Sequence, residues 1–271
     1  MVARAAIAHC RSQGDDVLGL SRSDLDIADR EAVAYSLERF HPDVVMNCAA
    51  YTNVDGAETN VDASYAANAT GPENLAAECR KLGAKFITIS TDYVFGGEHD
   101  RYYDERSDPH PLGVYAKSKL EGEGRSQAAN PDTLVVRSGW IFGPGGTNFL
   151  SVMPELLRQG KRLTAVSDSL GTPTYAVDLV ARMRELAALE VSGIVHVTNA
   201  GEGTTYFGYG QKVCELLDVD PELLSPVTDA ELKRPAQRPA NSKLVSIRAE
   251  SLGLQPLPHW EDALARFLNS R

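Results

Sequence analysis

The sequence Lys85-Phe-Ile-Thr-Ile-Ser-Thr-Asp-Tyr-Val-Phe95 changes in character after its fifth residue. Residues 85–89 form a short apolar run rich in β-branched side chains, which is typical of a strand buried on both faces of a sheet. The polar residues that follow, and the turn at 96–97, end that strand. Ligands of open α/β folds bind at the carboxyl edge of parallel strands, so this polar segment marks a candidate site.

Further short apolar runs and longer helical patterns alternate along the chain. The other expected strands are 17–20, 44–48, 133–137 and 194–197. The expected helices are 1–13, 29–40, 64–82 with a break at 71–72, 115–127, 149–159, 207–217 and 260–268. This alternation is typical of βαβ units, and it predicts an α/β fold with a doubly wound parallel sheet.

Gly and Pro become frequent after Gly143, which indicates a small, non-contiguous lobe over the ligand-binding edge of the sheet. We expect residues 1–142 to form a dinucleotide-binding domain to which 163–200 return. Residues 143–162 and 201–271 would form mainly the substrate-binding lobe. The sequence opens with a helix where a doubly wound dinucleotide fold has a strand and a Gly-rich turn, so we expect those two elements to be missing and cofactor binding to suffer.

Composition and charge exclude several classes of protein. Of the 271 residues, 43% are apolar and 24% are charged, as in ordinary globular proteins. The formal net charge of −10 argues against binding nucleic acid, which needs clustered Lys and Arg. No apolar stretch approaches the ~20 residues that span a bilayer, and residues 1–11 lack the features of a secretion signal. We therefore expect a cytoplasmic protein with no membrane partner.

The cysteines and histidines indicate neither disulfides nor a metal. The four cysteines lie far apart, which predicts reduced thiols; they are Cys10, Cys48, Cys79 and Cys214. The six histidines are scattered without ligand spacing, so we predict no metal site.

The segment Tyr115-Ala-Lys-Ser-Lys119 opens a predicted helix and carries the sharpest chemical signal. Residues four apart share a helix face, so the Lys119 ammonium can lie near the Tyr115 phenol. A cation there stabilises the phenolate that remains after the phenol donates a proton. Taken alone, this spacing is more often a surface pair. Thr91, at the end of a buried strand, changes that interpretation, because its hydroxyl can position a carbonyl oxygen beside Tyr115.

Several separate stretches together resemble one family. They are 24–27, 47–55 with Glu58, 68–72, 90–95, 115–119, 137–144, 171–175 and 238–242. On these motifs the chain resembles the dTDP-4-dehydrorhamnose reductases, members of the extended short-chain dehydrogenase/reductase family, over essentially its full length apart from the beginning. The resemblance implies a Rossmann-like fold and the reduction by NAD(P)H of the 4-keto group of a dTDP-4-keto-6-deoxy sugar. The implied conversion is dTDP-4-dehydro-L-rhamnose to dTDP-L-rhamnose, in cell-wall or polysaccharide sugar biosynthesis.

The resemblance also implies a role for individual residues. Tyr115 would be the general acid, Lys119 would hold the nicotinamide ribose and tune the tyrosine, and Thr91 would orient the keto oxygen. The cofactor-binding residues would be Arg22, Asp26, Ile27, Ala49, Ala50, Tyr51, Asn68, Tyr115 and Lys119. The substrate-binding residues would be Asp92, Tyr93, Trp140, Asn148 and Arg238.

Three of these residues have plainer alternatives. Arg22 follows an expected strand where NAD-specific proteins often carry an acid, which favours NADPH with NADH as the alternative, but Arg22 could also be an exposed loop arginine. Trp140 could be an ordinary core residue, and Arg238 an ordinary surface charge. An aromatic face suits a sugar ring and an arginine fork suits a diphosphate, which favours the functional interpretation of both.

Two other classes of function remain open. One is a non-catalytic relative that binds a partner enzyme, as the regulatory β-subunit of methionine adenosyltransferase does; the missing Gly-rich turn favours it, whereas intact Thr91, Tyr115 and Lys119 favour catalysis. The other is a nucleotide-sugar epimerase or dehydratase, against which the stretches around Trp140 and Tyr175 argue. The expected partner is a dTDP-sugar, and a homodimer remains an alternative to a monomer.

Overall fold

The computed structural model describes residues 1–98 and 100–270 and is built around a four-stranded parallel sheet of order β1-β2-β3-β8. Its strands are β1 (Val44–Asn47), β2 (Lys85–Thr91), β3 (Leu134–Ser138) and β8 (Gly193–His196). The register places Val44 opposite Lys85, and Ile87 opposite Leu134. The predicted α/β fold with a parallel sheet is therefore confirmed.

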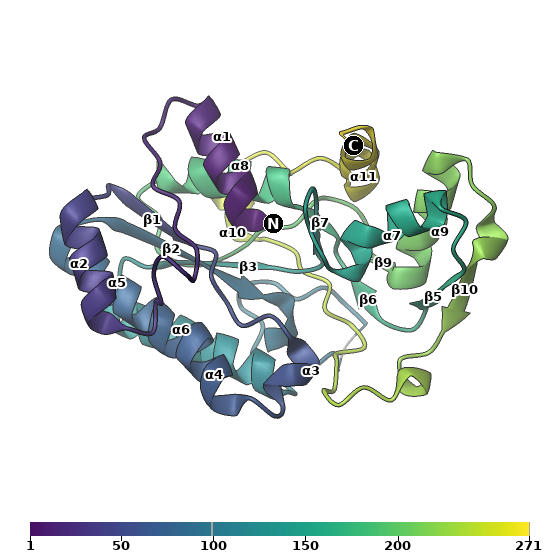
Figure 1. Ribbon diagram of the computed structural model, residues 1–271, viewed down its shortest axis with the longest axis horizontal. Coiled ribbons are helices and arrows are strands. Elements are labelled where there is room, and N and C mark those ends of the chain that lie inside the picture. Colours follow the sequence, from purple (N-terminus) through teal and green to yellow (C-terminus); the bar gives the residue numbers. More distant parts are fainter. Residues whose placement is uncertain (99, 271) are drawn as a thin grey trace.

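Helices cover both faces of this sheet (Figure 1). On one face lie α2 (Arg30–Phe40), α5 (Gly71–Leu82) and α6 (Val114–Ala129), and on the other lie α1 (Val2–Ser12), α8 (Ala176–Ala187) and α10 (Arg248–Ser251). Successive strand residues serve opposite faces: Phe86 joins the core under α2 and α5, whereas Ile87 joins the core under α8. This two-sided burial explains why the strands are apolar throughout rather than alternating.

The expected strand at 17–20 is wrong. These residues form no regular structure, and none of the strands in the described part of the chain pairs with them. Leu18 and Leu20 are 48% and 41% exposed. A β-branched or apolar run becomes a strand only where a neighbouring strand accepts its hydrogen bonds, and the sequence pattern cannot report that partner.

The expected break at Gly71-Pro72 is also wrong. The chain stays helical from α4 (Val61–Tyr65) through a π-helical turn (Ala66–Thr70) into α5. Pro72, which has no N–H to donate, comes directly after the π-helical turn, where the regular α-helical hydrogen-bond pattern is already interrupted. Gly71 is required for another reason, because a Cβ atom there would lie 2.4 Å from the Ile27 side chain.

Helix α8 was not expected from the sequence. Its buried residues Leu179, Met183 and Leu186 follow the i, i+4, i+7 spacing of an amphipathic helix, so the signal was present. A 3₁₀ turn (Asp92–Val94) follows β2 directly, and short α3 (Val54–Ala57) follows β1 after the loop 48–53. Both therefore lie at the carboxyl edge of the sheet.

A second body, the lobe, packs beside that edge (Figure 1). Its helices are α7 (Phe149–Arg158), α9 (Tyr206–Leu217) and α11 (Trp260–Asn269), with 3₁₀ turns at Pro221–Leu223 and Ala230–Leu232. Its strand pairs are β4 (Ile141–Phe142) with β7 (Thr174–Tyr175), β5 (Leu163–Val166) with β10 (Leu224–Val227), and β6 (Leu170–Gly171) with β9 (Thr204–Thr205). The expectation that the chain returns to the main sheet at residue 163 is wrong for β5, which pairs in the lobe.

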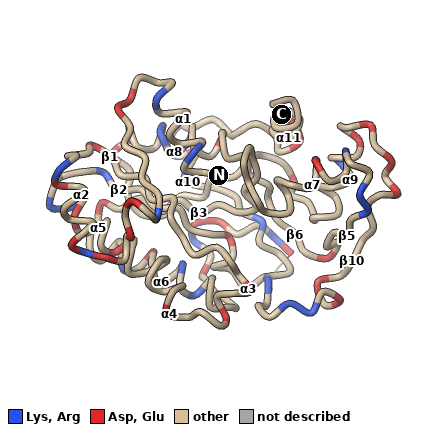
Figure 2. The backbone as a smooth tube through the Cα atoms, in the orientation of Figure 1, with Lys and Arg blue, Asp and Glu red and all other residues tan. Residues whose placement is uncertain are grey.

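Charge is spread over both bodies. Figure 2 shows acidic and basic residues interspersed along the chain. Within residues 1–98 and 100–270, no helix combines the length and the apolar character needed to cross a bilayer.

Candidate active site

Thr91 and Tyr115 meet where β2 ends and α6 begins. Thr91 is the last residue of β2, and Tyr115 is the second residue of α6. The Thr91 hydroxyl lies close to the Tyr115 phenol and favours its phenolate form. The Tyr93 ring packs edge-on against Tyr115, with 6.2 Å between ring centroids. The structure thus brings together the hydroxyl and the phenol that the sequence motifs paired.

Lys119 lies one turn further along α6 and is 5% exposed. Its Nζ donates a hydrogen bond to the Ile89 carbonyl oxygen at 2.7 Å. Burial lowers the pKa of Lys119 to about 8, although the negative charge of Glu123 opposes the shift. Burial raises the pKa of Tyr115, with the Thr91 hydroxyl acting against it. At neutral pH the phenol therefore keeps its proton, and a cation stands on the same helix face.

Asp92 extends this contact into a hydrogen-bonded chain. The Thr91 hydroxyl donates to Asp92 Oδ1 at 3.1 Å, and the Ser242 hydroxyl donates to Asp92 Oδ2. Burial raises the pKa of Asp92 to about 7. Gly139 leaves room for this carboxyl group, because a Cβ atom there would lie 2.4 Å from its carbon. Asp92 holds Thr91 on one side and the lobe residue Ser242 on the other.

The lobe contributes two stacked aromatic side chains to the site, Trp140 and Tyr206. The rings of Trp140 and Tyr206 stack with 3.8 Å between centroids, and the Tyr206 phenol lies close to that of Tyr93. Trp140 has a φ of 49°, which is rare for a bulky residue and marks a position fixed by its surroundings. Gly171 leaves room for the indole, because a Cβ atom there would lie 2.1 Å from it.

Arg238 lines the same pocket as Trp140 and Tyr206. Its guanidinium binds both carboxylate oxygens of Asp55, at 2.8 and 2.9 Å, and donates to the Ala236 carbonyl oxygen at 2.7 Å. Arg238 holds the pKa of Asp55 below its usual value. A small pocket lies between the two bodies, lined by Tyr93, Trp140, Ser169, Tyr206, Asp229, Arg234, Arg238, Pro239 and Ser242. Three of the expected substrate-binding residues thus share one pocket.

Asn148 is not among the residues that line this pocket. Its Oδ1 accepts a hydrogen bond from the Ser151 backbone N–H at 3.0 Å, which caps α7. Its Nδ2 donates to the Ile141 carbonyl oxygen at 2.7 Å. Both the oxygen and the nitrogen of the Asn148 side-chain amide therefore hydrogen-bond to the backbone.

The loop after β1 is held by two asparagines. Asn47 Oδ1 accepts from the Ala49 N–H at 3.0 Å. The fully buried Asn68 accepts from the Tyr51 N–H at 2.8 Å and donates to the Tyr51 carbonyl oxygen at 3.1 Å. Asn68 thus fixes the backbone beside Ala50, whereas Ala49 is exposed.

The remaining expected cofactor residues lie before α2. Arg22 and Asp26 are exposed, and Asp26 Oδ1 accepts from the Ala28 N–H at 3.0 Å. Ile27 packs on α5 at Gly71.

Two features fit an anionic dinucleotide at this edge. The first turn of α1 has no side-chain cap, and the Met1 amine lies near Cys48, directly after β1, so free N–H groups stand at the sheet edge. The buried Ser138 hydroxyl, opposite Thr91 in the sheet, has no hydrogen-bond partner among the described residues. Both offer donors to a ligand.

Sequence reasoning missed several residues that build the site. Glu58 accepts a hydrogen bond from the Val114 N–H at 2.8 Å and so caps the helix that carries Tyr115. Ser242 lay in a recognised motif without an assigned role, whereas no local pattern singles out Tyr206. Only the folded chain brings Tyr206 to Trp140.

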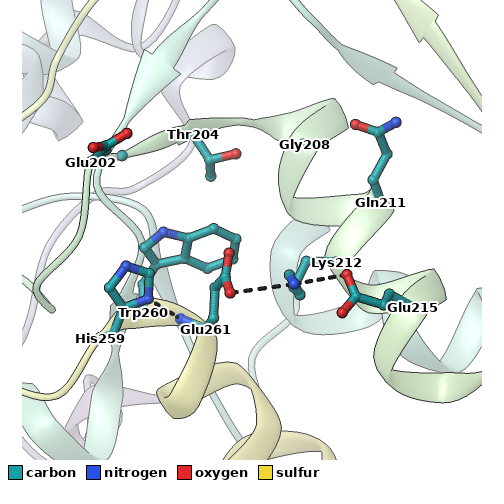
Figure 3. A pocket seen from close by; sticks show the side chains of 10 residues that line it. Glu202, Thr204, Gly208, Gln211, Lys212, Glu215, His259, Trp260 and Glu261 are labelled. Carbon is teal, nitrogen blue, oxygen red and sulfur yellow. Dashed lines mark hydrogen bonds and ion pairs between the residues drawn. The ribbon is translucent and has the colours of Figure 1, made fainter.

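A second hollow lies between α9 and α11 (Figure 3). Lys212 stands in it and forms ion pairs with Glu215 at 2.7 Å and with Glu261 at 3.3 Å. The lining is acidic, with Glu202, Glu215 and Glu261 against Lys212, and none of the expected site residues lines it.

The comparisons with known proteins agree on one family. The family model described as "RmlD substrate binding domain" matches residues 1–271. A dTDP-4-dehydrorhamnose reductase of Mycobacterium tuberculosis (strain ATCC 25618 / H37Rv) is 43% identical over 267 residues, 96% of this chain and 87% of that protein. The dTDP-4-dehydrorhamnose reductase of Streptomyces griseus is 40% identical over 258 residues, 93% of this chain and 84% of that protein.

A solved structure agrees with these relatives. The crystal structure of dTDP-4-dehydrorhamnose reductase from Bacillus anthracis str. Ames, in complex with NADP, has a TM-score of 0.95 to this chain at 30% identity. The match covers 100% of this chain and 95% of that one.

Proposed function

Because the chain belongs to the dTDP-4-dehydrorhamnose reductase family, we propose that it reduces the 4-keto group of a dTDP-4-keto-6-deoxy sugar with NADPH. The product would be dTDP-L-rhamnose, made from dTDP-4-dehydro-L-rhamnose. The relatives confirm the family that the sequence motifs indicate. The observation that carries the proposal is the proximity of the Thr91 hydroxyl to the Tyr115 phenol, together with buried Lys119 one turn further along the same helix.

Tyr115 supplies the proton in this reaction. Reduction builds negative charge on the keto oxygen, and a donor fixed beforehand at that oxygen stabilises the transition state. The Tyr115 phenol keeps its proton at neutral pH because burial raises its pKa. Thr91 orients the keto oxygen, since its hydroxyl can rotate from Asp92 towards a bound carbonyl.

Lys119 makes this proton donation easier. Its positive charge, one helical turn from Tyr115, stabilises the phenolate left behind. Because the pKa of Lys119 is about 8, the ammonium form predominates at neutral pH and is lost in mildly alkaline solution.

Residues of the sheet body would hold the cofactor. Bound NADPH supplies the hydride. The ribose next to the nicotinamide suits Tyr115 and Lys119, the loop at 49–51, with Ala49 exposed, suits the dinucleotide backbone, and Asp26 with Ile27 suits the adenine. Exposed Arg22 suits a 2′-phosphate, and the solved relative with NADP supports NADPH over NADH.

The lobe would hold the sugar nucleotide. Trp140 offers an aromatic face for the sugar or the base, and the Arg238 fork suits the diphosphate. Asp92 and Tyr93 lie between these groups and Tyr115. Asn148 would contact the nucleotide from the start of α7.

An assay with the purified chain tests the proposal. We expect NADPH oxidation to depend on a dTDP-4-keto-6-deoxy sugar, with dTDP-L-rhamnose as the product by mass spectrometry and sugar analysis. dTDP-glucose serves as a control, because it has no keto group to reduce. NADPH and the keto sugar both bound without turnover would favour a non-catalytic relative, and turnover of dTDP-glucose without net oxidation of NADPH would favour an epimerase or dehydratase.

We propose that the sheet body binds the dinucleotide and the lobe binds the substrate. A cytoplasmic location is supported by the four unpaired cysteines, and cell fractionation tests it. Sedimentation distinguishes a monomer from the homodimer that the sequence leaves open.

A further inference from the structure

A buried ion pair lies directly behind Lys119. Glu123 is 3% exposed and Arg137, on β3, is 2% exposed. The Arg137 guanidinium donates to both carboxylate oxygens of Glu123, with Nη2 to Oε2 at 2.6 Å and Nε to Oε1 at 3.0 Å. The Ser90 hydroxyl donates to Oε1 as well. Glu123 is thus fixed from two strands of the sheet.

Glu123 and Lys119 share one face of α6. They are four residues apart, and both side chains end on consecutive residues of β2. Lys119 donates to the Ile89 carbonyl oxygen, and Glu123 accepts from the hydroxyl of Ser90. The carboxylate and the ammonium are therefore anchored at neighbouring positions of β2, and the negative charge of Glu123 acts on Lys119.

Stability alone does not explain this arrangement. Taking two charges out of water is costly, and replacing a buried ion pair by apolar residues of similar volume is often neutral or stabilising. The reaction described above also assigns no step to Glu123 or Arg137.

We propose that Glu123 is a positioning residue that keeps the buried Lys119 side chain charged and anchored beside Tyr115. This inference rests on the proposed function of Lys119. Without the carboxylate, burial would favour the neutral amine, which cannot stabilise a phenolate. The Glu123–Arg137 pair would then act on the active site indirectly, through the charge and position of Lys119.

The charges around Lys119 agree with this role. Burial lowers the pKa of Lys119, and the two opposing influences are Glu123 on α6 and Cys48 in the loop after β1. Cys48 has its own pKa raised to about 12, so it is a neutral thiol at neutral pH. From β3, Arg137 is engaged with Glu123, and Tyr115 on α6 is neutral. Glu123 is therefore the anion that supports the ammonium.

Titration of Lys119 tests the proposal independently of activity. Isotope-labelled lysine side chains would be followed by NMR, with the Lys119 signal assigned by its loss in Lys119→Met. We expect a midpoint near pH 8 in the wild type and a fall of about one pH unit or more in Glu123→Gln. An unchanged midpoint in a folded Glu123→Gln protein would overturn the proposal.

A second variant covers the case in which Glu123→Gln does not fold, since it leaves Arg137 buried without a counter-charge. Glu123→Gln combined with Arg137→Met removes both charges, so no arginine is left buried without a counter-charge. We expect the Lys119 midpoint to fall there too, and a wild-type midpoint would refute the role of Glu123. Glu123→Asp keeps the charge and should restore the midpoint towards that of the wild type.

The control is Glu121→Gln, the same change at an exposed position on the same helix. It should leave the midpoint unchanged. In an active enzyme, the alkaline limb of the pH–rate profile should move with the Lys119 midpoint in each Glu123 variant. Should the wild type fail to reduce any keto sugar nucleotide, the proposed function fails, while the NMR titration still decides whether Glu123 sets the charge of Lys119.

Discussion

The sheet body and the lobe contribute to the site in different ways. On the sheet side, Thr91 and Tyr115 lie at the end of a strand and the start of a helix, so regular elements fix them. On the lobe side, Arg238 is held by Asp55, 183 residues earlier, and Ser242 by Asp92, 150 residues earlier. Under the proposed function, the proton chemistry would depend on local structure, whereas recognition would depend on contacts that only the complete fold creates.

This comparison predicts different consequences of mutation. Changes on the sheet side should lower the turnover number with little effect on KM. Changes on the lobe side should mainly raise KM, because they act on binding.

The largest effect is expected for Tyr115→Phe. The variant keeps the ring and its packing but loses the proton donor, so kcat should fall by about 10²–10⁴-fold. Thermal unfolding should change little, because the loss of one hydroxyl costs at most about 1 kcal/mol. Tyr35→Phe, at a 65% exposed site on α2, is the matched control and should keep full activity. Retained turnover in Tyr115→Phe would remove Tyr115 from its role.

Asp92→Asn should reveal how much burial of the Asp92 carboxylate lowers the free energy of unfolding, and how this loss depends on pH. The pKa of Asp92 is about 7 in the folded protein and 3.8 as a free side chain, so the folded state binds the extra proton between these values. The free energy of unfolding of the wild type, relative to Asp92→Asn, should therefore fall as pH rises from about 4 to 7, and stay level above 7. Urea unfolding at a series of pH values measures this difference. A relative stability that rises over this range would show that Asp92 is stabilised as a carboxylate.

The same contrast explains what the sequence could predict. The three residues Thr91, Tyr115 and Lys119 follow from patterns within 29 positions, because a strand end and a helix start place them. The stacking of Tyr206 on Trp140 could not be predicted, since it depends on a left-handed Trp140 backbone and on Gly171.

Strand prediction failed for a related reason. Residues 17–20 have the composition of a strand, yet no strand in the described ranges pairs with them. Pairing is a property of two segments, whereas composition describes only one.

Arg238→Lys tests recognition on the lobe side. Lysine keeps the charge but loses the two-pronged geometry that suits a diphosphate, so KM for the sugar nucleotide should rise about tenfold with kcat nearly unchanged. Arg184→Lys is the matched control, because Arg184 also binds both oxygens of a carboxylate, Asp15, on the sheet body. It should leave KM unaltered. A loss of kcat in Arg238→Lys would place Arg238 in the chemistry instead of recognition.

The smallest effect is expected at Asn148, where structure and recognition can be separated. Asn148→Ala removes the cap of α7 and should lower the free energy of unfolding by about 1 kcal/mol. Asn148→Asp keeps an oxygen that can accept from Ser151, so stability should be retained. The new charge would repel a nearby diphosphate, so KM should rise in Asn148→Asp if the residue contacts the nucleotide. Equal KM values in the wild type and Asn148→Asp would show that Asn148 acts only as a helix cap. Trp140 and Arg238 would then be the lobe residues that remain as candidates for binding the sugar nucleotide.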